Sequence, residues 1–352
     1  MPIISRGVLR SSIVLFTVLI GVMRAQHASA DEKTDRQKLR TIARVSAAEG
    51  FFGAVLVTEK GRPLLDEGVG RLGATRMRPN DRFWIASISK SFTATAVLKC
   101  LDQRLFNLDD TASKFFQNVP QEKANITVLQ LLTHQSGLPQ SYAAEEITDR
   151  DKAVHAILGE PLAAKPGTKF SYSNSNYELL AAIVETAAGK PFQDYVQNEI
   201  LRPAALRDTG FWFEKGADQV IPTAAPLPPR LRHKQWELGA GGMYSTTSDL
   251  ARFYRALKSG KIISPTSTDR LFQKQIKIQE GWSGLGWFIG ATSSGNERIF
   301  TRGNDSFGPN GLVYIYPQRE VVIVVLTHAG DKSDDASWSR VVLADLESAL
   351  KL

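Results

Sequence analysis

Apolar residues along the chain form strand-like runs near both ends. Two runs, at residues 51–58 and 63–69, are separated by the polar turn Glu59-Lys60-Gly61-Arg62, the pattern of a β-hairpin. Four more short runs, separated by turn residues, follow at 284–290, 298–302, 312–316 and 321–327. The last of them is almost continuously apolar, which is typical of a strand covered on both faces. The pattern therefore predicts strands at the two ends of the chain.

Helical periodicity marks other parts of the chain, both between these runs and outside them. Residues 89–103 repeat apolar positions with a period near 3.6, and a polar helix is expected at 33–48. Further helices are predicted at 176–188, at 334–351 and from Thr246-Thr247-Ser248-Asp249 to Lys258, where the first four residues resemble a helix-capping sequence.

This order of elements predicts an α+β fold. One antiparallel sheet is formed from both termini and flanked by helices, and a mostly helical lobe is inserted between its two parts. We expect the sheet lobe to comprise about residues 31–105 and 280–352, and the helical lobe about residues 106–279.

The first thirty residues have the pattern of a secretory signal peptide. Two arginines precede the apolar run 13–23, and Ala28-Ser29-Ala30 supplies a small-residue cleavage site. The run has 11 residues, whereas a membrane-spanning helix needs about 20. We therefore predict cleavage after Ala30, a periplasmic or secreted domain of residues 31–352, and no stable membrane span. An arginine at the end of the run leaves an uncleaved anchor as the alternative.

Charge and cysteine content narrow the functional classes. The formal charge of +7 falls to +4 without the first thirty residues, which carry three arginines and no acidic residue. Basic and acidic residues are interleaved along the chain, so we expect no nucleic-acid partner. Cys100 is the single cysteine and lies in an apolar helical stretch, where we interpret it as a core residue. The five histidines are scattered, and we expect neither a metal nor an organic cofactor.

Ser87-Ile88-Ser89-Lys90 is the first candidate for chemistry. Residues three apart share one face of a helix, so Lys90 can reach the Ser87 hydroxyl. A serine hydroxyl is a weak nucleophile until a neighbouring base takes its proton, and a desolvated lysine can be that base. The simpler explanation is a surface serine that caps a helix, with an exposed lysine.

Tyr172-Ser173-Asn174 is the second candidate. A tyrosine in a loop can pass a proton between a nucleophile and a leaving group, and an amide can bind a substrate. Alone, such a triplet is more often a turn tyrosine followed by a helix cap.

Together these segments resemble the serine β-lactamase-related family, which includes class C β-lactamases, D-alanyl-D-alanine carboxypeptidases and family VIII esterases. The similarity extends over roughly residues 40–350. Four segments carry it in family order: Phe83-Trp84-Ile85-Ala86-Ser87-Ile88-Ser89-Lys90-Ser91-Phe92-Thr93-Ala94, Ile126-Thr127-Val128 through Leu131-Leu132-Thr133-His134-Gln135-Ser136-Gly137-Leu138-Pro139, Phe170-Ser171-Tyr172-Ser173-Asn174 and Gly241-Gly242-Met243-Tyr244-Ser245-Thr246.

The resemblance implies a β-lactamase/transpeptidase-like fold and a role for each matched residue. Ser87 is implied to be the acylated nucleophile, Lys90 its proton partner and Tyr172 the general base or acid, while Asn174 is implied to bind substrate. Whether Lys90 or Tyr172 takes the first proton stays open.

The third family motif, Lys-Thr-Gly or His-x-Gly on a strand, is altered here. The corresponding residues are Thr301-Arg302-Gly303, followed by Asn304, so Thr301 replaces the family's cation. Strand alternation predicts that Arg302 points to the face opposite Thr301. Gly303 lets a substrate lie close to the backbone, and the Asn304 N–H can complete an oxyanion hole with the Ser87 N–H. We assign these four residues to the substrate-binding region, and we interpret His328-Ala329-Gly330, which resembles the motif, as structural.

Three functions remain open. The first is a secreted serine hydrolase that cleaves a small ester, amide or peptide through an acyl-enzyme on Ser87, with a cell-wall-derived substrate as one option. The second is a penicillin-binding D,D-peptidase or β-lactamase-type protein that binds its substrate covalently and releases it slowly. The third is a non-catalytic envelope protein with a degenerate third motif. In the family the missing cation binds a substrate carboxylate, so we expect weak turnover of β-lactams.

Overall fold

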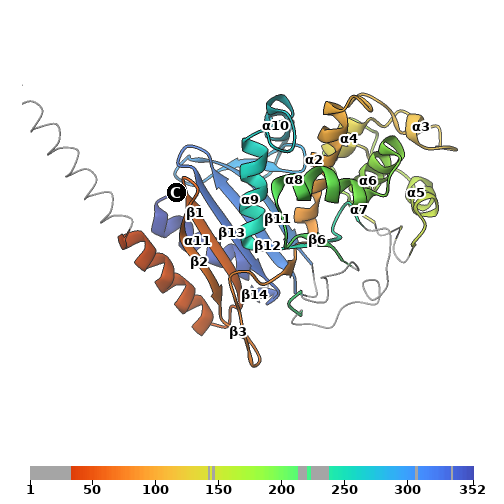
Figure 1. Cartoon of the computed structure of the whole chain (residues 1–352). Helices are drawn as coiled ribbons and strands as arrows, with labels where there is room; N and C mark the ends of the chain where they lie inside the picture. Colours follow the sequence, from red (N-terminus) through yellow and green to blue (C-terminus); the bar gives the residue numbers. More distant parts are fainter. Residues whose placement is uncertain are drawn as a thin grey trace, which may run out of the picture.

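The computed structural model describes residues 33–141, 143–144, 147–212, 220–222, 238–305, 308–333 and 336–352 (Figure 1). The predicted signal peptide at residues 1–30 lies outside these ranges. Among the residues that are described, no helix has both the length and the apolar character needed to cross a bilayer.

An eight-stranded antiparallel sheet forms the centre of the fold (Figure 1). Its strand order is β2-β1-β13-β12-β11-β10-β9-β8, so β1 from the N-terminal part pairs with β13 from the C-terminal part. The predicted α+β fold with one sheet built from both ends of the chain is confirmed. The strands of this sheet are β1 (Gly53–Glu59), β2 (Arg62–Val69), β8 (Ile276–Ile278), β9 (Gly281–Ser283), β10 (Phe288–Ala291), β11 (Glu297–Asn304), β12 (Asn310–Tyr316) and β13 (Val321–Thr327).

One predicted strand is wrong. The run 284–290 is divided, because β9 ends at Ser283 and β10 begins at Phe288. Between them the chain turns, with the Gly284 N–H donating to the Trp287 carbonyl at 2.8 Å. Gly286 has φ +72°, a conformation that glycine adopts without strain and that interrupts a strand.

Both faces of the sheet are covered, as the continuous apolar run at its centre predicts. In β13 the side chains of Val322, Val324 and Leu326 belong to one buried cluster, while Val321, Ile323 and Val325 belong to another. Helices α2 (Ser89–Asp102) and α9 (Thr247–Lys258) contribute to the first cluster. Helix α11 (Trp338–Leu350) and the helical residues 33–48 contribute to the second, and Figure 1 shows them to the left of the sheet, on the side away from α2 and α9.

The remaining elements are short and lie mostly in the middle of the chain. The helices are η1 (Ala86–Ile88), α3 (Ala112–Phe115), α4 (Val128–Leu132), α5 (Arg150–Gly159), α6 (Asn174–Ala188), α7 (Phe192–Val196), the π-helical turn η2 (Gln197–Leu201), α8 (Arg202–Ala204) and α10 (Pro265–Leu271). A three-stranded sheet has the order β5 (Phe83–Trp84), β7 (Met243–Ser245) and β6 (Gly210–Phe211). Two further pairs are β3 (Arg71–Leu72) with β4 (Thr75–Arg76), and β14 (Asp331–Ser333) with β15 (Ala336–Ser337).

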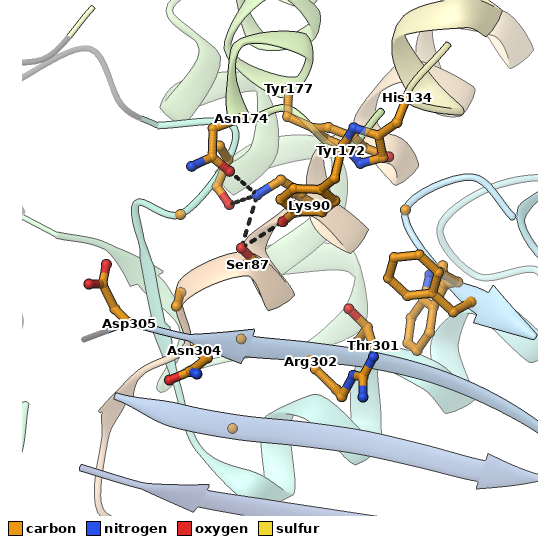
Figure 2. Close-up of a pocket in the computed structure, with 18 of the residues that line it drawn as sticks. Ser87, Lys90, His134, Tyr172, Asn174, Tyr177, Thr301, Arg302, Asn304 and Asp305 are labelled. Atoms are coloured by element: carbon orange, nitrogen blue, oxygen red, sulfur yellow. Dashed lines mark hydrogen bonds between the residues drawn. The ribbon is translucent and has the colours of Figure 1, made fainter. Parts of the chain in front are cut away.

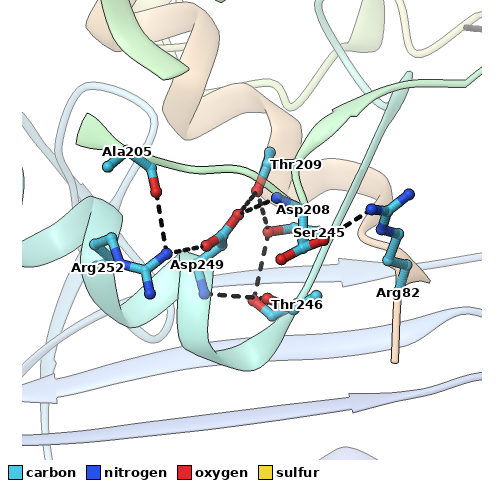
Figure 3. A network of polar contacts seen from close by, with 8 residues as sticks. All are labelled: Arg82, Ala205, Asp208, Thr209, Ser245, Thr246, Asp249 and Arg252. Atoms are coloured by element: carbon cyan, nitrogen blue, oxygen red, sulfur yellow. Dashed lines mark hydrogen bonds and ion pairs between the residues drawn. The ribbon is translucent and has the colours of Figure 1, made fainter. Parts of the chain in front are cut away.

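A buried carboxylate joins α9 to this small sheet (Figure 3). Helix α9 begins after Thr246, whose side chain accepts from the Asp249 N–H at 3.2 Å, and it ends at Lys258 as predicted. Asp249 accepts from the Asp208 N–H at 2.8 Å and from the Thr209 hydroxyl at 2.9 Å, and it forms an ion pair with Arg252. These contacts fix the residues that lead into β6.

Candidate active site

Ser87 lies in a constrained turn, η1, between β5 and α2. The preceding residue, Ala86, has φ +44°, which is uncommon for a residue with a side chain and persists only where the surroundings hold it. Those surroundings belong to β7, because the Ile85 N–H donates to the Met243 carbonyl at 3.0 Å and the Met243 N–H donates to Ser89 Oγ at 3.2 Å. The turn holds the half-buried Ser87 at a cavity of about 1450 Å³.

Lys90 lies one turn further along, with its ammonium group among three oxygen acceptors (Figure 2). Its Nζ is 3.0 Å from Ser87 Oγ, 2.8 Å from Asn174 Oδ1 and 2.8 Å from the Ala240 carbonyl oxygen. An ammonium has three N–H donors, so these acceptors match it completely. Lys90 is only 4 % exposed, and the simpler explanation of an exposed surface lysine is wrong.

Tyr172 approaches Ser87 from another element. It lies in the loop before α6, and its hydroxyl is 2.9 Å from Ser87 Oγ. The Lys90 ammonium lies 5.0 Å from the centre of the Tyr172 ring. Asn174 begins α6, and because its Oδ1 is bonded to Lys90, its amide Nδ2 is the group that can donate to a substrate. The structure thus brings together the four residues of the first two motifs.

Two groups at this site were missed by the sequence analysis. The Ala240 carbonyl is the third acceptor for Lys90, and the only signal for it was the neighbouring segment that begins at Gly241. His134 is the second, because its ring centre lies 4.5 Å from that of Tyr172. Its signal was its place in a family segment, which did not reveal that it contacts the tyrosine.

The third motif places a neutral side chain on the nucleophile's side. Thr301 is 2 % exposed and points toward the Ser87 side of β11, whereas Arg302 points away (Figure 2). The Arg302 guanidinium lies 5.1 Å from the centre of the Phe300 ring and donates to Glu280 at 2.7 Å. The predicted alternation of Thr301 and Arg302 is therefore confirmed, while a contact between Arg302 and a substrate stays a prediction.

Gly303 packs directly against the nucleophile turn. A Cβ atom at this position would lie 2.1 Å from the Ile85 carbonyl oxygen and 3.0 Å from the Ser87 backbone nitrogen. A side chain therefore does not fit, and this close approach brings the end of β11 beside the Ser87 N–H. The exposed Asn304 follows at the end of the strand, where its N–H stays the predicted second oxyanion donor.

Two structural interpretations made from the sequence are confirmed. Cys100 is fully buried, and burial raises the pKa of its thiol to about 12, so it is not a reactive nucleophile. His328 is also fully buried, accepts from the Trp84 N–H at 3.0 Å and contacts the Ile221 carbonyl oxygen at 2.7 Å. It therefore supports the strand that precedes the nucleophile.

The sheet built from both termini and the Ser-Lys-Tyr arrangement define a protein of the β-lactamase/transpeptidase-like class. Residues 39–346 match the family model described as Beta-lactamase, and the chain belongs to this family. It is thus a member of a family of serine hydrolases and proteins similar to penicillin-binding proteins.

The chain is similar to several known proteins at low sequence identity. "Protein flp" of Staphylococcus aureus is 26 % identical over 322 residues, which cover 83 % of this chain and 63 % of that protein. The chain thus spans somewhat less than two thirds of that relative's length. Among solved structures, D-amino acid amidase from Ochrobactrum anthropi superposes with a TM-score of 0.77 at 20 % identity, covering 90 % of this chain and 98 % of the amidase. EstCE1, described as a hydrolase with promiscuous acyltransferase activity, gives 0.76 at 19 % identity, covering 91 % and 99 %. At such identities these two similarities establish the fold alone.

Proposed function

We propose that this protein is a working serine hydrolase, which cleaves carboxylic esters or amides through an acyl-enzyme on Ser87. One observation carries the proposal: Ser87 Oγ lies 3.0 Å from Lys90 Nζ and 2.9 Å from the Tyr172 hydroxyl, at the wall of a large cavity. A nucleophile within hydrogen-bond reach of its proton partners is what acyl transfer requires.

The hydrogen bonds around Lys90 favour Tyr172 as the base. In the proposed mechanism Lys90 donates to all three acceptors, as an ammonium does, and therefore does not take the serine proton. In this mechanism Tyr172 reacts as the phenolate and takes the Ser87 proton across the 2.9 Å between their oxygens, with the Lys90 ammonium 5.0 Å from the centre of its ring. Ser87 Oγ then bonds to the substrate carbonyl carbon, the bond to the leaving group breaks, and Tyr172 returns the proton to that group.

The second half of the reaction reuses the same atoms. Water bonds to the acyl carbon and gives a proton to Tyr172, the bond to Ser87 Oγ breaks, and the serine regains a proton from Tyr172. In both halves negative charge develops on the carbonyl oxygen. The Ser87 N–H and the Asn304 N–H are the donors proposed to stabilise it, because Gly303 holds β11 against the nucleophile turn.

The absence of a positive charge on the Ser87 side of the third motif favours substrates that carry no carboxylate there. Thr301 carries no charge on the side of Ser87, and the charge of Arg302 is paired with Glu280 on the other face. A substrate carboxylate would therefore find no cation at the place where the family's third motif supplies one. We propose esters or amides without that carboxylate as substrates, with cell-wall-derived molecules as one source.

Hydrolysis of p-nitrophenyl butyrate by residues 31–352, beside Ser87→Ala, tests the activity. The proposal expects steady turnover that the variant lacks. A single burst followed by slow release would favour the penicillin-binding alternative, and no reaction with any ester, amide or penicillin would favour the non-catalytic one.

A second variant tests the substrate class separately. Thr301→Lys restores a cation at the third motif, and it is expected to speed acylation by benzylpenicillin relative to the wild-type protein. Thr301→Val serves as the uncharged control of similar size. Equal acylation rates in Thr301→Lys and Thr301→Val would refute the charge argument without affecting the proposed hydrolase activity.

We also propose that the protein is exported and cleaved after Ala30. The support is the sequence pattern of residues 1–30. N-terminal sequencing of the protein recovered from the periplasm and the medium tests it, and an uncleaved protein that stays with the membrane fraction would contradict it.

A further inference from the structure

His134 lies in the segment Thr133-His134-Gln135-Ser136-Gly137, to which the proposed mechanism gives no role. Its side chain is 3 % exposed and lies next to two tyrosines, with its ring centre 4.5 Å from that of Tyr172 and 5.1 Å from that of Tyr177. Figure 2 shows His134 next to Tyr172, on the side away from Ser87. No contact with Ser87 is found for it, and Tyr172 is the residue of the proposed proton transfer whose ring it contacts.

The same histidine holds the chain on both sides of Tyr172. Its backbone carbonyl accepts from the Ser171 N–H at 2.8 Å, and its Nδ1 accepts from the Ser173 N–H at 3.2 Å. Tyr172 is the residue between these two bonds. Because a tyrosine side chain is long, a small rotation of this short segment would move the hydroxyl away from Ser87 Oγ.

A chain of hydrogen bonds keeps the His134 Nδ1 in its accepting form. The Leu138 N–H donates to Ser136 Oγ at 3.0 Å, so the Ser136 hydroxyl proton is free to donate to Asn176 Oδ1. The Asn176 amide Nδ2 then faces His134 Nδ1 at 3.1 Å. With two N–H groups directed at it, Nδ1 carries no proton.

Burial and charge keep the ring neutral. Desolvation, and then the nearby Lys90 ammonium, lower the pKa of His134 to about 3. A neutral His134 thus lies against the Tyr172 ring throughout the pH range in which esters are assayed, and it can keep accepting from Ser173.

We propose that His134 is a positioning residue, which holds the Tyr172 hydroxyl at hydrogen-bond distance from Ser87 Oγ by accepting bonds from the backbone on both sides of Tyr172. This inference rests on the proposed function, because the position of the Tyr172 hydroxyl affects the reaction only if Tyr172 transfers a proton at Ser87.

Two substitutions separate the accepting atom from the backbone conformation. His134 has φ +56°, which both glycine and asparagine tolerate. In asparagine Oδ1 is attached to Cγ, as Nδ1 is in histidine, so His134→Asn can accept from Ser173. His134→Gly has no side-chain acceptor. Val342→Ala, in the core under the opposite face of the sheet, is the control for lost packing.

Ester hydrolysis at saturating and limiting substrate gives the first measurement. His134→Gly is expected to lower kcat by about 30- to 100-fold with little change in KM, since a misplacement of about 1 Å costs on the order of 100-fold. His134→Asn should stay within about fivefold of the wild-type kcat, because it keeps the bond to Ser173. Val342→Ala should leave kcat unchanged. An unaltered kcat in His134→Gly, or an equal loss in both His134 variants, would overturn the proposal.

Hydrogen–deuterium exchange of the peptide that contains Tyr172 gives a second measurement, which needs no activity. The Ser173 amide should exchange faster in His134→Gly than in the wild-type protein or His134→Asn. If the wild-type protein hydrolyses no ester or amide, the proposed function fails, and exchange alone then decides whether His134 holds this segment. Equal exchange of the Ser173 amide in all three proteins would show that His134 does not hold this segment.

Discussion

Gly303→Ala tests how closely β11 must approach the nucleophile turn. The added Cβ would lie 2.1 Å from the Ile85 carbonyl oxygen, whereas carbon and oxygen atoms in contact are about 3.3 Å apart. Both the carbonyl and the Ser87 nitrogen, 3.0 Å from this Cβ, belong to the backbone, so no flexible side chain can yield. The strand and the turn must therefore separate by about 1 Å, the difference between these contact distances.

This separation affects the proposed oxyanion hole more than the overall fold. The two proposed donors, the Ser87 N–H and the Asn304 N–H, lie on the two parts that move apart. Losing one such donor lowers kcat by about 10²- to 10³-fold. The free energy of unfolding should fall by about 1–3 kcal/mol, as is common for an overpacked position. We therefore expect kcat/KM to drop by about 100-fold in a protein that remains folded.

The assay is p-nitrophenyl butyrate hydrolysis, with urea unfolding of the same samples. Gly159→Ala is the matched control, because it makes the same exchange at the end of α5, where a Cβ would meet nothing within 4 Å. That control should keep full activity. A Gly303→Ala protein with more than about a third of the wild-type kcat/KM would refute the reasoning, since a 1 Å separation costs far more.

Three more outcomes follow from buried titratable side chains. Lys90→Met should lower kcat on the same ester by about 10³-fold or more, because Ser87 and Tyr172 lose the ammonium that lies 3.0 Å from Ser87 Oγ and beside the Tyr172 ring. Burial lowers the pKa of His134 to about 3 and that of His328 to about 4. Below about pH 6.5 and down to these values, both histidines are protonated in the unfolded chain but neutral in the native protein, so stability falls as the pH falls. Urea unfolding should therefore show full stability above pH 6.5 and a loss of about 2.5 kcal/mol per histidine at about pH 4.5. Asp249→Ala should cost about 2 kcal/mol in the same assay, because it removes the carboxylate that accepts from Asp208 and Thr209 and pairs with Arg252.

The parts of this fold that were predicted correctly have local causes. The apolar run in β13 indicated a strand covered on both faces, and its side chains do divide between two clusters. The start of α9 was predicted from Thr246 and Asp249, three residues apart, and they form the expected capping bond. The strand predicted at 284–290 was wrong because a hydropathy pattern carries no information about the backbone turn at Gly286.

The candidate site also combines a contact that local sequence predicts with one that it does not. Ser87 and Lys90 are three residues apart at the start of a helix, so their contact follows from helix geometry alone. Tyr172 is 85 positions from Ser87, and no pattern within the chain relates the two. Only the resemblance to known families joined them in the sequence analysis. Long-range contacts of this kind depend on how α6 packs against α2, which local sequence does not encode.

His134 and Thr301 show why a residue's identity is weaker evidence than its surroundings. A histidine near neutral pH is commonly a proton carrier, yet burial and Lys90 keep His134 neutral, and Ser173 and Asn176 direct N–H groups at its Nδ1. Thr301 is informative for the opposite reason, because a neutral side chain faces Ser87 where the family's third motif has a cation. Arg302, the nearest positive charge in the sequence, does not replace it, since it points to the other face of β11 and pairs with Glu280. The consequence for substrate choice therefore depends on the direction of two adjacent side chains, and strand alternation was sufficient to predict that direction.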